Sequence, residues 1–308
     1  NAELAGTISC LWNDRQLSDA SAILRQNNFY ANVLASAERG WIGGGEAYIE
    51  QGGVGLPNAG AEFEAFRDWE RRFLFHKSTT LAAEPVPYVR QTHVVWRVTD
   101  AFPNGGDPQL ALPPETEGLK TTYSFGGSTY TTHRVTGAGL YLRHTWGQIV
   151  PALFAEAQPH STAYVWTYVY SPRPQAAGAL IEGYNYSRSE RDLAPLSGSW
   201  DRMGTQIWLN DSLIAPPRFD NSGKTLVSHE DLLLNENFTG RSPQKVWLRA
   251  GWNKVLLKLP FQPDGGTRLK KWMFTFVLTD LTGRQALDGL IYSPERVLPS
   301  APSRTSRR

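Results

Sequence analysis

The sequence predicts a mainly β protein, an antiparallel β-sandwich with a small α-helical part at the amino-terminal end. In residues 164–170, large aromatic side chains occupy every second position, which is the period of a β-strand. Further short strands are predicted at residues 206–210, 246–249, 253–259 and 272–279. Polar turns such as residues 250–253 and 263–266 separate them, and no helical pattern intervenes. Consecutive strands joined by turns favour an antiparallel sandwich.

The first 60 residues predict one strand and one helix. Residues 7–12 form a short apolar strand pattern. Ser18 and Asp19 can cap the start of a helix. The helix that follows carries its apolar residues at helical spacing, namely Ile23, Tyr30, Leu34 and Ala37. A glycine-rich segment at residues 43–60 then breaks the pattern.

A second helix is predicted from Ala61 to His76. Acidic residues lie near its start and Arg71 and Arg72 lie near its end, an order that suits the helix dipole. An apolar stripe runs along it, made of Phe63, Phe66, Trp69 and Phe73. Because such a stripe is costly to leave in water, we expect it to dock on the sandwich or on a second copy of the chain, as a homo-oligomer.

Tryptophan residues divide into two groups by position. Both faces of the strand at residues 164–170 are apolar, so this strand is expected to be central. Period-two tryptophans such as Trp166 and Trp208 are expected in the core, since sandwich interiors are filled by such residues. Trp200 and Trp252 adjoin turn residues and are expected to be the more exposed pair.

Composition excludes several classes of partner and cofactor. A net charge of +2 gives no reason to expect nucleic acid, and no apolar run is long enough to span a membrane. The sequence has one cysteine, and its six histidines are not spaced as zinc ligands are, so no zinc site is predicted. Residues 220–223 and 264–266 contain oxygen ligands but too few for a calcium loop, so they are interpreted as turns. No cofactor is predicted. Residues 297–308 are expected to form a disordered basic tail.

The amino-terminal strand and helix resemble part of a known enzyme family. Residues 5–14 read Ala-Gly-Thr-Ile-Ser-Cys-Leu-Trp-Asn-Asp, and the helix closes on residues 37–41, Ala-Glu-Arg-Gly-Trp. This pair resembles the last strand and helix of a family 20 β-N-acetylhexosaminidase (β/α)8 barrel. The resemblance implies that Trp12 lines a sugar-binding pocket and that Asp14 accepts hydrogen bonds from sugar hydroxyls. On spacing alone, a core tryptophan and a turn-capping aspartate remain the alternative.

The later strands carry a second resemblance. Residues 162–172, residues 198–211 with the Ala-Pro-Pro at 215–217, and the Gly-Trp-Asn-Lys-Val-Leu-Leu-Lys run at 251–258 look like the jelly-roll, galactose-binding-like accessory domain of some Bacteroidetes-type hexosaminidases. The chain is therefore interpreted in three parts: a barrel remnant at 1–84, a sandwich at 85–296 and the tail at 297–308. The upstream catalytic barrel of the same protein is an implied partner.

The family's chemistry implies an inactive fragment of an active parent. Family 20 enzymes remove terminal β-linked GlcNAc or GalNAc by substrate-assisted hydrolysis, which uses adjacent Asp and Glu side chains. No Asp in this sequence is followed by Glu, and Glu230, preceded by His229, stands in the reverse order before Asp231. We therefore expect no catalytic residue in this chain. A glycan-degrading parent is expected to be periplasmic, cell-surface or secreted.

Two other functions compete with this interpretation. The sandwich could be a carbohydrate-binding module, with Trp200 and Trp252 as the candidate sugar-stacking residues. Alternatively, it could be purely structural and support the barrel.

Overall fold

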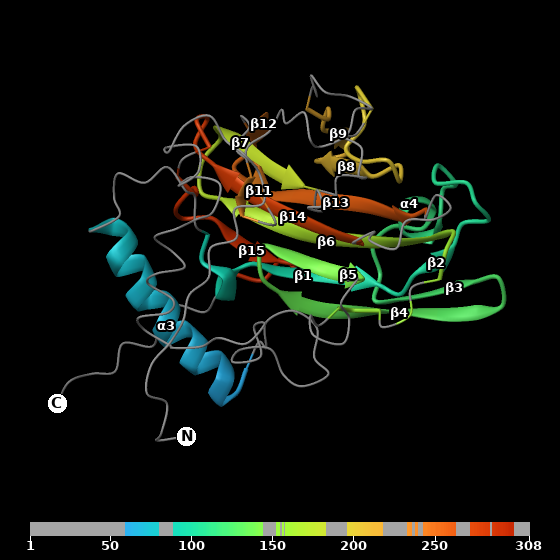
Figure 1. Ribbon diagram of the computed structural model, residues 1–308, viewed down its shortest axis with the longest axis horizontal. Coiled ribbons are helices and arrows are strands. Elements are labelled where there is room, and N and C mark those ends of the chain that lie inside the picture. The colour runs from blue at the N-terminus through green and yellow to red at the C-terminus, as the bar shows by residue number, and fades with distance from the viewer. Residues whose placement is uncertain are drawn as a thin grey trace.

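The computed structural model describes the chain in segments that include most of the predicted sandwich. These are residues 59–79, 89–143, 152–154, 156, 158–182, 196–217, 233–235, 238–239, 243–262, 272–283 and 285–298. The described part is mainly β, as the sequence predicted, with every strand pairing antiparallel (Figure 1).

The larger sheet is centred on β6 (Ser161–Ser171). Its strands run, in spatial order, β3 (Thr122–Phe125), β4 (Ser128–Thr136), β1 (Val95–Thr99), β6, β13 (Gly251–Phe261), β8 (Gln206–Leu209) and β9 (Ser212–Leu213). The short strands β2 (Phe102–Pro103) and β15 (Ile291–Ser293) also pair with β6. Nearly every side chain of β6 is buried, which confirms its predicted central place.

The smaller sheet contains four strands, in the order β12 (Gln244–Leu248), β7 (Gln175–Glu182), β14 (Trp272–Thr279) and β5 (Gly139–Arg143). In sequence β12 follows β7 by more than sixty residues, yet the two pair along their length, from Gln244 opposite Ala179 to Leu248 opposite Gln175. A separate pair joins β10 (Leu233–Asn235) to β11 (Phe238–Thr239). Because β12 has a sheet neighbour on one side only, it forms an edge of the sandwich among the described strands.

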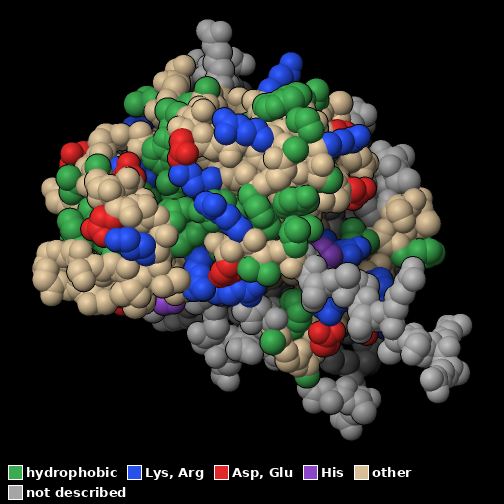
Figure 2. Space-filling view, turned by 180° about the vertical axis from the view of Figure 1, so that it is seen from behind, with side chains coloured by type: hydrophobic (Ala, Val, Ile, Leu, Met, Phe, Trp, Pro, Cys, Tyr) green, Lys and Arg blue, Asp and Glu red, His purple; other side chains and the backbone are tan. Residues whose placement is uncertain are grey.

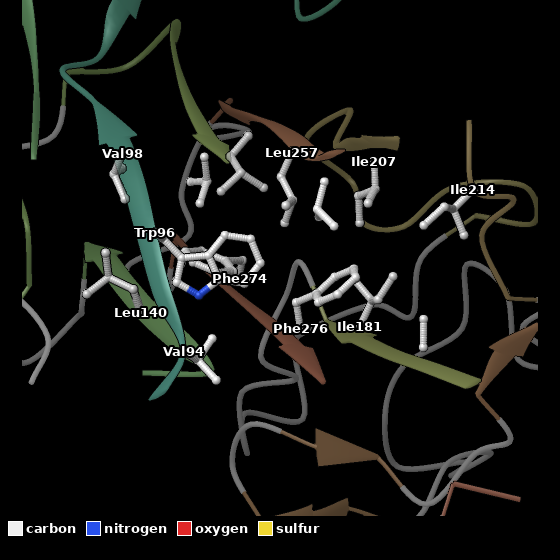
Figure 3. Close-up of a cluster of buried hydrophobic side chains, with 14 of the residues drawn as sticks. Val94, Trp96, Val98, Leu140, Ile181, Ile207, Ile214, Leu257, Phe274 and Phe276 are labelled. Carbon is white, nitrogen blue, oxygen red and sulfur yellow. The ribbon is translucent and has the colours of Figure 1, made fainter. Parts of the chain in front are cut away.

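The main core lies between the two sheets. Trp96 from β1 meets Phe274 and Phe276 from β14 edge to face, with ring centroids 5.2 and 5.7 Å apart (Figure 3). Such geometry is favoured because the positive ring edge meets the negative ring face. Alternate residues of β7, β12, β13 and β14 point into the same cluster, so the period-two pattern read from the sequence corresponds to an inner and an outer face.

The predicted helix at Ala61–His76 is confirmed as α3 (Ala61–Ser78), with Glu64 3.1 Å from Arg67 on its surface. It contacts the short helix η1 (Gln91–His93), where the Thr92 hydroxyl donates to the buried carboxylate of Glu70 at 2.7 Å. Phe63 is partly buried, whereas the side chains of Phe66, Trp69 and Phe73 lie outside the described residues. Docking of the whole stripe therefore stays a prediction.

No helix among the described residues has the length and apolar character that a bilayer crossing needs. The proposed division at residue 84 and the tail at 297–308 also stay predictions, since residues 80–88 and 299–308 are outside the described part.

Candidate functional site

The most exposed tryptophan of the described residues is Trp247, on the edge strand β12. Its side chain is 59% exposed, whereas Val246 and Leu248 on either side face the core. Lys245 and Trp247 point away from the sandwich, and Arg249, which follows β12, is exposed at the next position of the same parity. We call these three residues the Trp247 strip.

The neighbours of Trp247 leave its ring open. Its partner across the strand pair is Ala176, which is itself exposed and too small to cover an indole. Lys245 lies opposite Gly178, where an added Cβ would sit 2.4 Å from the Asp280 carbonyl oxygen and 2.7 Å from the Pro243 ring. A close-packed loop therefore borders the strip on one side, while small residues keep the surface next to Trp247 flat.

A buried amide holds the end of the strip in place. Asn253 is fully buried, and its Oδ1 accepts the Arg249 backbone N–H at 2.8 Å while its Nδ2 donates to the Arg249 carbonyl at 2.8 Å. The same Oδ1 accepts from Asn210 Nδ2 at 2.8 Å, and the Asn210 Oδ1 accepts the Lys254 N–H. Because these bonds tie the Arg249 backbone to two neighbouring strands, the end of the strip that follows Trp247 is held in place.

A second aromatic surface lies on the outer face of the larger sheet. Trp252 is partly buried and meets Tyr170 edge to face, with ring centroids 5.3 Å apart. Lys254, two residues along β13, pairs with Asp211 in the β8–β9 turn. The guanidinium of Arg296 lies 4.0 Å above the ring of Tyr168. Much of this surface is therefore already in contact with other side chains of the chain.

Another part of that outer face packs against residues 104–120, which include the short helix α4 (Pro113–Thr116). Lys258 is fully buried there, and its Nζ donates to the carbonyl oxygens of Gln109 and Leu110 at 3.2 and 2.9 Å. The same Nζ lies 2.9 Å from Glu115, whose carboxylate also accepts from the Tyr164 hydroxyl. Burial, with the negative charge of Glu115, raises the pKa of Tyr164 far above its usual range. Lys258, Glu115 and Tyr164 therefore bond to one another and to residues 104–120, and they do not form an open reaction site.

The prediction that Trp200 is exposed is wrong. Trp200 is only 4% exposed and belongs to the core cluster between the sheets. The physical reason is the next residue, Asp201, which is buried and accepts hydrogen bonds from the backbone of Met203, Gly204 and Thr205. Burial raises the pKa of Asp201, although these hydrogen bonds oppose the shift. The carboxylate closes a tight turn, and the turn directs Trp200 inward.

Several predicted residues lie outside the described part, including Trp12, Asp14, His229 and Glu230. Their roles stay predictions. Trp252 lies in the described part and is partly buried rather than fully exposed. Trp166 is buried as predicted, whereas Trp208 is only partly buried. Among the described residues, no three His, Cys, Asp or Glu side chains are placed to share a metal ion.

Sequence reasoning missed Trp247, although a signal was present. In the run Lys245-Val-Trp-Leu-Arg249, the tryptophan shares its parity with two cations and the aliphatic residues occupy the other parity. Since alternate residues of a strand share a face, this pattern places Trp247 on the solvent side. By contrast, Trp166 shares its parity with Tyr164 and Tyr168 and is buried.

On the face of the molecule seen from behind, the described apolar side chains do not form one continuous area (Figure 2). In the rear view of the molecule, hydrophobic side chains are interspersed with Lys and Arg (Figure 2).

No family model matches the chain, and no curated protein matches it. Among solved structures, the chain is similar to a family 35 carbohydrate-binding module from Clostridium thermocellum. The identity is 12% and the TM-score 0.19, over 38% of this chain and 78% of that module. A likeness of this size carries no argument about function.

Proposed function

We propose that this chain belongs to a β-N-acetylhexosaminidase and that its β-sandwich is a carbohydrate-binding accessory domain. One observation carries the binding role: an indole that is 59% exposed stands on a rigid strand, with an alanine as its cross-strand neighbour. Scattered exposed apolar residues are ordinary on protein surfaces. A tryptophan differs because its flat apolar face can stack on a pyranose ring while flanking polar groups bond the hydroxyls.

Cation placement supports the same role. Lys245 and Arg249 lie two residues on either side of Trp247, roughly 7 Å away in each direction along the strand. Their N–H groups can donate to hydroxyl and ring oxygens of a sugar held on the indole. Aromatic stacking with flanking donors is the arrangement that saccharide binding requires, and it needs no deep cavity.

The enzymatic part of the proposal rests on the sequence resemblance at residues 5–14 and 37–41 and on its order before the sandwich. In the proposed parent, Trp12 and Asp14 contact the terminal N-acetylhexosamine, and the upstream barrel supplies the catalytic Asp and Glu. Glycan with terminal GlcNAc or GalNAc is the proposed substrate. The parent acts in the periplasm, at the cell surface or outside the cell.

A glycan array probed with the whole 308-residue chain tests the binding role. We expect retention on a defined set of oligosaccharides, and Trp247→Ala should weaken the best of these at least about tenfold. Trp252→Ala is the matched control, since it removes a partly buried indole from the other sheet. Equal binding by the wild-type chain and Trp247→Ala would reject this site.

Hydrolysis of an aryl β-N-acetylglucosaminide tests the enzymatic role. We expect turnover by the full parent and none by this chain alone. Turnover by this chain would mean that a catalytic acid has been overlooked, with Glu230 the first residue to replace.

A further inference from the structure

We infer that the saccharide bound by the Trp247 strip is anionic and carries sulfate or carboxylate groups. This inference rests on the proposed binding function and adds the chemical class of the ligand. It depends on the charges around Trp247 and on how the cations of the two outer faces are paired.

The strip presents cations on both sides of the indole. Lys245 shares the outward face of β12 with Trp247, and Arg249 is exposed just after the strand, at the next position of the same parity. Arg173 is also exposed, in the turn that leads into β7, two residues before Gln175, which pairs with Leu248. The register therefore brings Arg173 to the same end of the strand pair as Arg249. Lys245 and Arg249 therefore flank the indole with positive charge, and Arg173 adds a further cation at the Arg249 end of the strand pair.

These cations have no acidic partner among the described residues, whereas two cations on the opposite outer face do. Lys254 pairs with Asp211, and Arg97 lies 3.0 Å from Glu295. One acidic residue, Asp280, has its backbone against Gly178, the cross-strand partner of Lys245. Its Oδ1 already accepts hydrogen bonds from the Thr282 N–H and hydroxyl. The charges of Lys245 and Arg249 are therefore not neutralised by any described acid, unlike those of Lys254 and Arg97.

The chemistry of these groups selects oxyanions. Guanidinium groups form paired hydrogen bonds with planar carboxylate and with sulfate-type oxygens, and an ammonium adds a compact charge. Lys245 and Arg249 lie about 13 Å apart along the strand, with the indole between them. This distance exceeds one pyranose ring, so an oligosaccharide stacked on Trp247 can place charged substituents near both ends.

A role in preventing aggregation, rather than in binding, predicts a different effect of replacing these cations. Charged side chains on an edge strand oppose pairing with another sheet edge. If that were their only role, replacing them would change self-association and would not change the preference among saccharides.

Isothermal titration of the whole chain distinguishes these possibilities. The probes are sulfated chondroitin oligosaccharides, their desulfated counterparts and a neutral oligosaccharide of equal length. Desulfated chondroitin keeps its uronate carboxylates, so the series separates sulfate from carboxylate as the source of charge. We expect tighter binding of at least one charged form, with affinity falling as salt rises because exposed charges are screened.

The variant Lys245→Gln/Arg249→Gln should weaken the charged ligand about tenfold and the neutral ligand by a clearly smaller factor, because glutamine keeps an N–H donor and loses only the charge. Arg134→Gln/Arg202→Gln is the matched control, since it removes two exposed arginines outside the strip. Equal affinity for charged and neutral forms would overturn the inference and leave the proposed binding function standing. Absence of binding to every saccharide would defeat both, and tighter binding of single-stranded DNA than of any saccharide would assign the strip to nucleic acid.

Discussion

Replacing Lys258 with Met tests the buried contact that holds residues 104–120 over the larger sheet. The Lys258 Nζ donates to two carbonyl oxygens and lies 2.9 Å from Glu115, and the lysine side chain is 1% exposed. Methionine keeps most of the apolar stem and removes the charge and all donors. Glu115 would then keep the Tyr164 hydroxyl as its donor and lose its cation.

The expected cost follows from this geometry. Removing one partner of a buried ion pair costs about 3–5 kcal/mol. The Glu115 side chain is 24% exposed, so water can partly solvate the abandoned carboxylate, and we expect about 3 kcal/mol. For a domain of this size, each kcal/mol lowers Tm by about 2–4 °C, so Tm should fall by about 6–12 °C.

Differential scanning calorimetry, with urea unfolding as a second measure, checks this value. Lys254→Met is the control: the residue lies on the same strand and outer face, but its partner Asp211 is 78% exposed, so the loss should be below about 1 kcal/mol. Equal Tm values for the two variants would refute the reasoning that burial makes the Lys258 pair different.

Three further outcomes follow from the structure. Burial raises the pKa of Asp100, but hydrogen bonds from His133 and from the Thr131 backbone and side chain together outweigh it and hold the pKa below the ordinary value. This carboxylate therefore contributes stability above its unfolded pKa, and that stability is lost as pH falls through the folded pKa. Asp100→Asn should flatten that acid limb in urea unfolding between pH 2 and 6. Trp200→Ala should cost about 3–5 kcal/mol in the same assay because it empties core volume, and a loss below about 1 kcal/mol would contradict its burial. Gly178→Ala should destabilise by about 1–3 kcal/mol, since the new Cβ meets backbone at 2.4 Å, and an unchanged urea midpoint would show that the loop yields freely.

The period-two pattern predicted the strands well because burial on alternate sides is a local property. Residues 272–279 form β14 with the bounds read from the sequence, and the aromatic run at 164–170 lies inside β6. Sheet order could not be predicted in this way. The neighbour of β7 on one side is β12, and only the folded chain shows that Trp247 faces Ala176.

The candidate site was predicted less well, for two physical reasons. Proximity to a turn was taken as exposure for Trp200, but a buried Asp201 carboxylate can turn the chain inward. A period-two tryptophan was taken as core, yet Trp247 shares its face with Lys245, and Arg249 follows at the same parity. Lys258 gave no local signal either, because the Leu110 carbonyl that it bonds lies 148 residues earlier in the chain.

The indole N–H region of the NMR spectrum, followed during titration with the best-bound oligosaccharide, tests the central claim most directly. The Trp247 signal is assigned by its disappearance in Trp247→Phe. We predict that this signal shifts on titration, while the signals of the buried Trp96 and Trp200 stay in place. A shift of the Trp252 signal with Trp247 unmoved would place binding on the other sheet, and no shift at all would contradict carbohydrate binding by this sandwich.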